Sequence, residues 1–159
     1  MGYNTAFLMI EGITAAEAMD LFDSRFDAAD LFASPGESTT FDVAASQSLH
    51  PNLALGEAGG WAVFWDPSGG LISSGFPLAA SKERRVFTGL LADADSRYEC
   101  GWFLGGTERP EAVTAAGAEV EVPAWGLDEG FVFGVMERLT GVTWADLQVA
   151  SYRRLESLG

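Results

Sequence analysis

The chain has 159 residues, 48% of them hydrophobic and 12% aromatic, which is enough for one domain with a sizeable core, spanning residues 1–159. Its net charge of −14 makes DNA or RNA an unfavourable partner, because an acidic surface repels phosphate. Cys100 is the only cysteine, so an internal disulfide is excluded. Without a leader-like or membrane-length apolar segment, we expect a cytoplasmic protein that binds no membrane.

The first predicted elements are a strand and a helix. Residues 5–10 form an apolar run of strand length. Glu17 follows Thr14 by three residues, the spacing of a capping box, so a helix should begin there. One face of this helix gathers apolar side chains, namely Ala15, Ala18, Met19, Phe22 and Phe26.

The adjacent face of this helix gathers four aspartates, which we call the acidic stripe: Asp20, Asp23, Asp27 and Asp30. Like charges at these spacings repel slightly, and only Arg25 lies nearby. The stripe is either a surface that binds a partner or a solvated helix face. A break near Asp23, with Asp27 as a new N-cap, would scatter it.

The strongest apolar run is at residues 61–65. Trp61, Val63 and Trp65 fall on one face of a strand and the intervening residues on the other, so both faces are apolar and the strand should lie inside a sheet. Residues 66–69 match a turn, which predicts a hairpin into residues 71–74. The preceding residues 31–58 are difficult to interpret and predict loop with one short strand at 40–43.

Further strands are predicted after the basic cluster at residues 82–85. Residues 86–91 form one, and residues 97–104 alternate so that Cys100 points toward the core beside Trp102. Residues 112–114 and 119–122 are weaker candidates.

Two helices are predicted near the C-terminal end. Asp128 can cap the first, with Gly141 in its C′ position, and Thr143 with Asp146 opens the second, which would carry Arg153 and Arg154 in its final turns. Together these elements predict an α+β fold. We expect an antiparallel β-meander with the N-terminal helix and both C-terminal helices packed on one side.

The residues offer little for catalysis or cofactor binding. His50 is the only histidine, and a His50–Cys100 dyad would need a thiol that the alternation directs inward. Acidic pairs such as those at 93/95 and 119/121 are explained by turn and edge solvation, and no nucleotide-binding glycine motif is present. We predict no catalytic residue, no metal and no cofactor.

Two stretches carry a resemblance: Glu-Gly-Ile-Thr-Ala-Ala-Glu-Ala at residues 11–18 and Val-Met-Glu-Arg-Leu-Thr-Gly-Val-Thr-Trp at residues 135–144. With a Gly-Trp hairpin between them, the chain resembles a small bacterial family of actinobacterial type that is classed as a domain of unknown function. The resemblance implies a shared order of elements. It supplies no catalytic residue and no ligand.

The charge and the missing catalytic set favour an acidic, non-enzymatic interaction module, such as an immunity, antitoxin or inhibitor protein that covers a basic face of its partner. The acidic stripe is the expected contact.

The alternative is a small-molecule-binding domain that uses an aromatic sheet face made by Trp61, Trp65 and Trp102, although core packing also explains these rings. An enzyme with carboxylate-only chemistry is a third hypothesis. The oligomeric state is not predicted.

Overall fold

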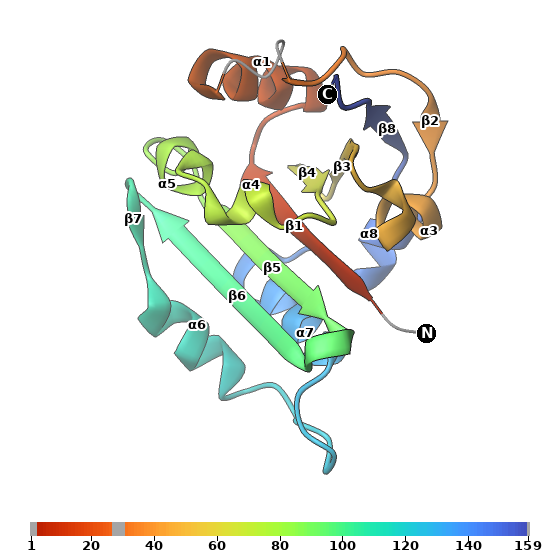
Figure 1. Cartoon of the computed structure of the whole chain (residues 1–159). Coiled ribbons are helices and arrows are strands. Elements are labelled where there is room, and N and C mark those ends of the chain that lie inside the picture. The colour runs from red at the N-terminus through yellow and green to blue at the C-terminus, as the bar shows by residue number, and fades with distance from the viewer. Residues whose placement is uncertain (1–2, 27–30, 159) are drawn as a thin grey trace.

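In the computed structural model, which describes residues 3–26 and 31–158, eight strands form one antiparallel sheet with helices on both faces (Figure 1). The strands are β1 (Asn4–Glu11), β2 (Ser38–Thr39), β3 (Leu53–Ala58), β4 (Trp61–Trp65), β5 (Val86–Ala92), β6 (Arg97–Leu104), β7 (Thr107–Glu108) and β8 (Tyr152–Leu155). The helices are α1 (Ala15–Phe26), α3 (Phe41–Ala44), α4 (Gly70–Ser73), α5 (Phe76–Ala80), α6 (Pro110–Gly117), α7 (Glu129–Thr140) and α8 (Trp144–Val149), with 3-10 turns η1 (Gln47–Leu49) and η2 (Asp93–Asp95). The predicted α+β class and antiparallel pairing are confirmed.

The strand order is β2-β8-β3-β4-β1-β5-β6-β7, so the predicted simple meander is wrong. β1 inserts between β4 and β5, and β8 inserts between β2 and β3. Residues 6–10 of β1 are fully buried, as expected for a strand covered on both faces. A run without a polar face has no place at an edge of the sheet, which is why the first strand lies at its centre.

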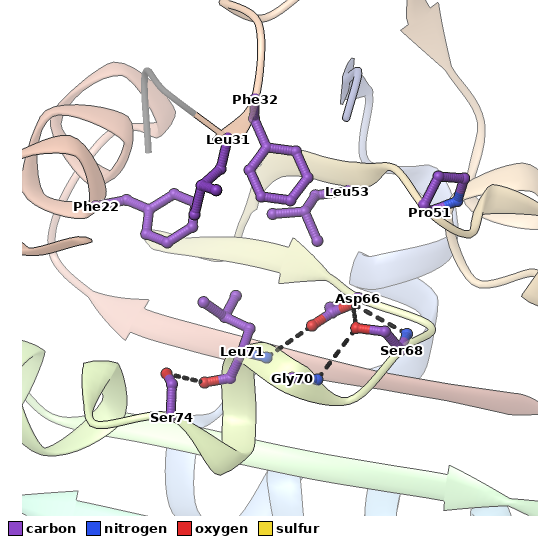
Figure 2. Close-up of a pocket in the computed structure, with 10 residues that line it drawn as sticks. All are labelled: Phe22, Leu31, Phe32, Pro51, Leu53, Asp66, Ser68, Gly70, Leu71 and Ser74. Atoms are coloured by element: carbon purple, nitrogen blue, oxygen red, sulfur yellow. Dashed lines mark hydrogen bonds between the residues drawn. The ribbon is translucent and has the colours of Figure 1, made fainter. Parts of the chain in front are cut away.

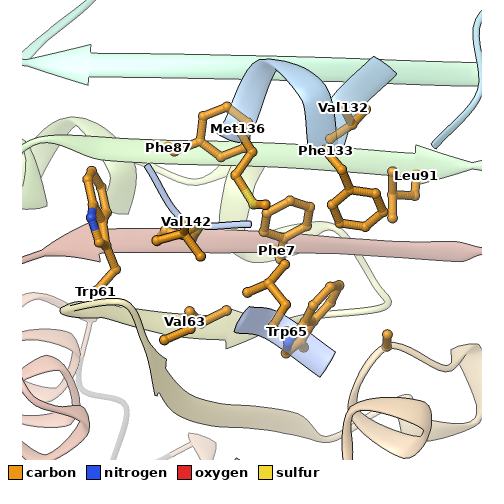
Figure 3. Close-up of a cluster of buried hydrophobic side chains, with 14 of the residues drawn as sticks. Phe7, Trp61, Val63, Trp65, Phe87, Leu91, Val132, Phe133, Met136 and Val142 are labelled. Carbon is orange, nitrogen blue, oxygen red and sulfur yellow. The ribbon is translucent and has the colours of Figure 1, made fainter. Parts of the chain in front are cut away.

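Each face of the sheet has its own core. On one face the Phe7 ring stacks on Phe133 of α7 with centroids 5.9 Å apart, and it lies 4.9 Å from the Trp65 ring (Figure 3). On the other face Phe22 of α1 packs edge-on against Phe64, with centroids 5.6 Å apart. Helix α1 therefore lies opposite α7 and α8, and the predicted placement of all three helices on one side is wrong. Two apolar sheet faces require two covering layers.

The predicted helix starts and the Gly141 helix end are confirmed. Thr14 and Glu17 exchange capping-box hydrogen bonds, as do Thr143 and Asp146. The Asp128 carboxylate caps α7 by accepting a hydrogen bond from the Gly130 N–H at 2.9 Å. Gly141 ends α7 with a φ of 77°, a left-handed conformation that favours glycine.

The predicted hairpin after β4 is wrong, because the hairpin precedes that strand. Gly59 and Gly60, with φ of 56° and 84°, form the two-residue turn between β3 and β4. Residues 66–69 do make a turn, closed by the Gly69 N–H donating to the Asp66 carbonyl at 3.1 Å. The chain then enters the short helix α4 instead of a strand.

Four further element predictions are corrected. Residues 40–43 enter helix α3, residues 112–114 belong to α6, and residues 119–122 carry no strand. Pro110 favours a helix because its fixed φ suits the first turn. The last predicted helix stops at Val149, and Arg153 and Arg154 lie in strand β8, which pairs with β3.

Candidate functional site

The acidic stripe is only partly within the described residues. Asp20 is exposed on α1, whereas Asp23 is half-buried and its Oδ1 atom has no hydrogen-bond partner within the described part of the chain. Asp27 and Asp30 lie outside the described residues. The stripe therefore stays a prediction, represented here by Asp20 and Asp23.

The three predicted tryptophans lie in one core cluster and are buried. Trp65 is fully enclosed, and its ring contacts Phe41 as well as Phe7. The rings of Trp61 and Trp102 lie 6.2 Å apart, and the Arg85 guanidinium sits 5.8 and 5.9 Å from their centroids. The aromatic pair thus already contacts a cation of its own chain.

The two groups weighed for a catalytic dyad come from separate elements, His50 from the end of η1 and Cys100 from β6. His50 is exposed next to η1, and burial raises the pKa of the Cys100 thiol to about 12, which suppresses the nucleophilic thiolate. Among the described residues, Asp66 is the one buried acidic side chain. Carboxylate-only chemistry of the paired, buried kind would require a second one.

An apolar hollow of about 250 Å³ opens between the end of α1, the start of β3 and helix α4 (Figure 2). Its lining is Phe22, Leu31, Phe32, Pro51, Leu53, Asp66, Ser68, Gly70, Leu71 and Ser74. Both oxygens of its one carboxylate are engaged: Asp66 Oδ1 accepts from Ser68, and Oδ2 accepts from the Leu71 N–H at 2.7 Å. Pockets for drug-sized ligands span roughly 300–1,000 Å³ and offer several free polar groups, so this hollow suits small apolar molecules at most.

A second feature, the acidic end, is formed where the N-terminal end of β1 meets the β5–β6 connection. We define it as Asp42 of α3, Asp93 of η2, Asp128 and Glu129. Asp93 fixes this region: its Oδ2 accepts the Tyr3 N–H at 2.7 Å, and its Oδ1 accepts a hydrogen bond from the Tyr98 hydroxyl. The acidic residues thus come from three separate segments of the chain.

Tyr3 and Tyr98 lie next to the carboxylates of the acidic end. The pKa of Tyr98 is raised to about 12. The largest cause is the hydrogen bond from its hydroxyl to Asp93, followed by burial and by the charges of Asp93, Glu129 and Asp128. The pKa of Tyr3 is raised by burial first and then by the charges of Glu129, Asp42 and Asp93. Burial is thus the main cause of the raised pKa of Tyr3 and the Asp93 hydrogen bond that of Tyr98, and the nearby carboxylates add to both pKa shifts because they disfavour a further negative charge.

Sequence reasoning treated Asp93 as a turn residue and Asp128 as a helix cap, and both descriptions are correct locally. It did not connect them, because their proximity depends on helix α7 packing against β5 and β6. That contact joins segments that are far apart in the sequence. The acidic end is therefore visible only in the folded chain.

Comparisons of the chain with family models, curated proteins and solved structures find no match. Among the helices of the described residues, none has the length and apolar character needed to cross a membrane.

Proposed function

We propose that this protein is a non-enzymatic interaction module that binds the basic face of a protein partner, as an immunity, antitoxin or inhibitor protein does. The observation that carries the proposal is the acidic end, where carboxylates from α3, η2 and the start of α7 gather around Tyr3 and Tyr98, both of which donate a hydrogen bond to Asp93. The net charge of −14 extends the same potential over the surface. Such a field accelerates encounter with a cationic partner and repels acidic ones.

The geometry favours this function over the small-molecule alternative. A binding domain that used the aromatic sheet face would need its rings to line a cavity, and Trp61, Trp65 and Trp102 are instead packed in the core. The apolar hollow lies on the other face and is lined by none of them.

The test begins with affinity capture on the full chain, from an extract of the cells that carry the gene naturally, at low and high salt. A captured protein is identified by mass spectrometry and purified, and its association rate is measured by stopped flow. The variant to be tested combines three substitutions that remove charge and keep side-chain shape: Asp42→Asn, Asp128→Asn and Glu129→Gln. Asp128 caps α7, and Asn caps a helix as well as Asp does. Asp93 is left intact because it bonds to Tyr3 and Tyr98.

We expect the triple variant to associate with the basic partner about tenfold more slowly at low salt, with the difference shrinking as salt is raised. Asp20→Asn, measured in the same way, tests whether the acidic stripe contributes to the association rate. An equal or larger loss with Asp20→Asn would move the contact to α1. A captured partner that binds at the same rate at all salt concentrations, or the recovery of no partner at low salt, would refute the proposal.

A further inference from the structure

One tryptophan is placed unlike the others. Trp125 is 78% exposed, whereas Trp61, Trp65 and Trp102 are buried and Trp144 packs on Phe133 with centroids 3.9 Å apart. Within the described part of the chain, no ring contact or hydrogen bond involves the Trp125 indole. A tryptophan left in solvent, in a protein whose four other tryptophans are buried or packed on another ring, marks a contact surface more often than it marks packing.

The segment that carries Trp125 is the α6–α7 loop, residues 118–128, which protrudes beyond the end of the sheet in Figure 1. Its base is held in place: the Arg138 guanidinium donates to the Glu119 carboxylate and to the Glu119 carbonyl, both at 3.0 Å. Val120 packs over Gly134 of α7, where an added Cβ would lie 2.8 Å from the Val120 Cγ1 atom. The base therefore fixes the direction in which the loop leaves the fold.

The tip of the loop is a turn that displays the indole. The Gly126 N–H donates to the Pro123 carbonyl at 3.0 Å, which closes a four-residue turn with Trp125 at its third position. Val122 and Leu127 on either side are 46% and 44% exposed. The tip is thus a small apolar knob on an anchored base, so little conformational entropy is lost when it docks.

The charge around the knob restricts the kind of partner that it can bind. Residues 118–129 carry four acidic side chains, of which Glu119 is paired with Arg138, and they run into the acidic end at Asp128 and Glu129. This rim repels anionic lipid headgroups and nucleic acid, and it repels a second copy of the same chain. It suits a protein whose apolar pocket is bordered by lysine and arginine.

We propose that Trp125, flanked by Val122 and Leu127, is the anchor that inserts into an apolar pocket on the basic face of the protein partner. The inference rests on the proposed function and assigns the two features separate roles. The acidic end speeds encounter, and the buried indole slows release, because desolvated aromatic anchors act mainly on dissociation.

The test places a photo-crosslinker at the knob. Trp125→p-benzoylphenylalanine is introduced into the full chain and irradiated in the cells that carry the gene naturally, and Val149→p-benzoylphenylalanine is the matched control. Val149 is an equally exposed apolar site, 82% accessible, at the end of α8. We expect one adduct specific to position 125, whose crosslinked peptide contains Lys or Arg beside apolar residues.

The purified partner then provides the kinetic readout. Trp125→Ala should raise the dissociation rate at least tenfold and leave the association rate and its salt dependence unchanged, while Val149→Ala changes neither. An adduct with lipid or with a second copy of this chain, adducts shared with position 149, or no adduct would each overturn the inference. A partner that binds Trp125→Ala as tightly as wild type and still depends on salt would overturn the anchor and leave the proposed function standing.

Discussion

The Asp66 carboxylate caps the backbone of Leu71, whose N–H donates to Oδ2 across 2.7 Å. Its other oxygen accepts from the Ser68 N–H at 3.0 Å and from the Ser68 hydroxyl at 2.6 Å. The side chain is 4% exposed, so these bonds replace almost all of its hydration. A single buried carboxylate thus turns the chain from β4 into α4.

Asp66→Asn should lower the free energy of unfolding by about 1–3 kcal/mol, because one amide NH₂ group must then face a backbone or hydroxyl donor. Urea unfolding followed by circular dichroism measures the change. Asp95→Asn, at an exposed position in η2, is the control and should leave the midpoint unchanged. A midpoint for Asp66→Asn equal to that of the control would mean that solvent reaches this carboxylate.

Trp65→Ala should cost about 3–5 kcal/mol, the range for emptying a large aromatic site in a core. The indole is fully buried between Phe7, Phe41 and Tyr152, which belong to β1, α3 and β8. The comparison is Trp125→Ala, which removes the same side chain from an exposed position and should change stability by less than about 0.5 kcal/mol. Similar denaturant midpoints for the two variants would contradict the assignment of Trp65 to the core.

Stability should fall as the pH rises from about 9 to about 12. Burial raises the pKa of Cys100 from 9.0 and of Tyr152 from 10.0, each to about 12, and the Asp93 hydrogen bond raises the pKa of Tyr98 to about 12. A pKa raised by folding contributes stability below the unfolded value and loses it as the pH climbs through the folded value.

Urea midpoints measured at intervals between pH 8 and pH 12 test this expectation. Tyr152→Phe removes one titrating group and should flatten the decline above pH 10. The same substitution also removes the 2.8 Å hydrogen bond from the Tyr152 hydroxyl to the Leu147 carbonyl. Each protein's decline is therefore measured relative to its own midpoint at pH 8. A midpoint that stays constant to pH 12 would show that the three groups ionise without disturbing the fold.

Local features of this chain are readable from its sequence because neighbouring residues determine them. The Thr14–Glu17 and Thr143–Asp146 caps and the Gly141 helix end follow from spacing alone. The burial of both faces of β4 follows from its continuous apolar run. These interactions span at most a few residues, and their energetics do not depend on the rest of the molecule.

Long-range arrangement is not readable in the same way. The turn at residues 66–69 fits a hairpin or a helix start equally well, and the outcome depends on a hydrogen bond that Asp66 makes five residues later. The two arginines of strand β8 are typical of the last turns of a helix, and the sequence therefore predicts a helix there. The segment is a strand because it pairs with the edge of β3. Gly56 of β3 accommodates the Tyr152 ring, since an added Cβ would lie 2.6 Å from its Cδ1 atom. The acidic end likewise depends on a long-range contact, the packing of α7 against β5 and β6.

The position of β8 between β2 and β3 has a consequence for synthesis on the ribosome. Strands β1, β3, β4, β5 and β6 can emerge and pair in turn, but β3 keeps one edge unpaired until residues 152–155 leave the exit tunnel. During that interval the nascent chain presents hydrogen-bonding groups of β3 that can recruit a strand from another molecule. Chaperone dependence and co-translational aggregation should therefore be greatest for ribosome-bound chains whose part outside the exit tunnel ends just before Tyr152, and should drop once Leu155 has emerged from the tunnel.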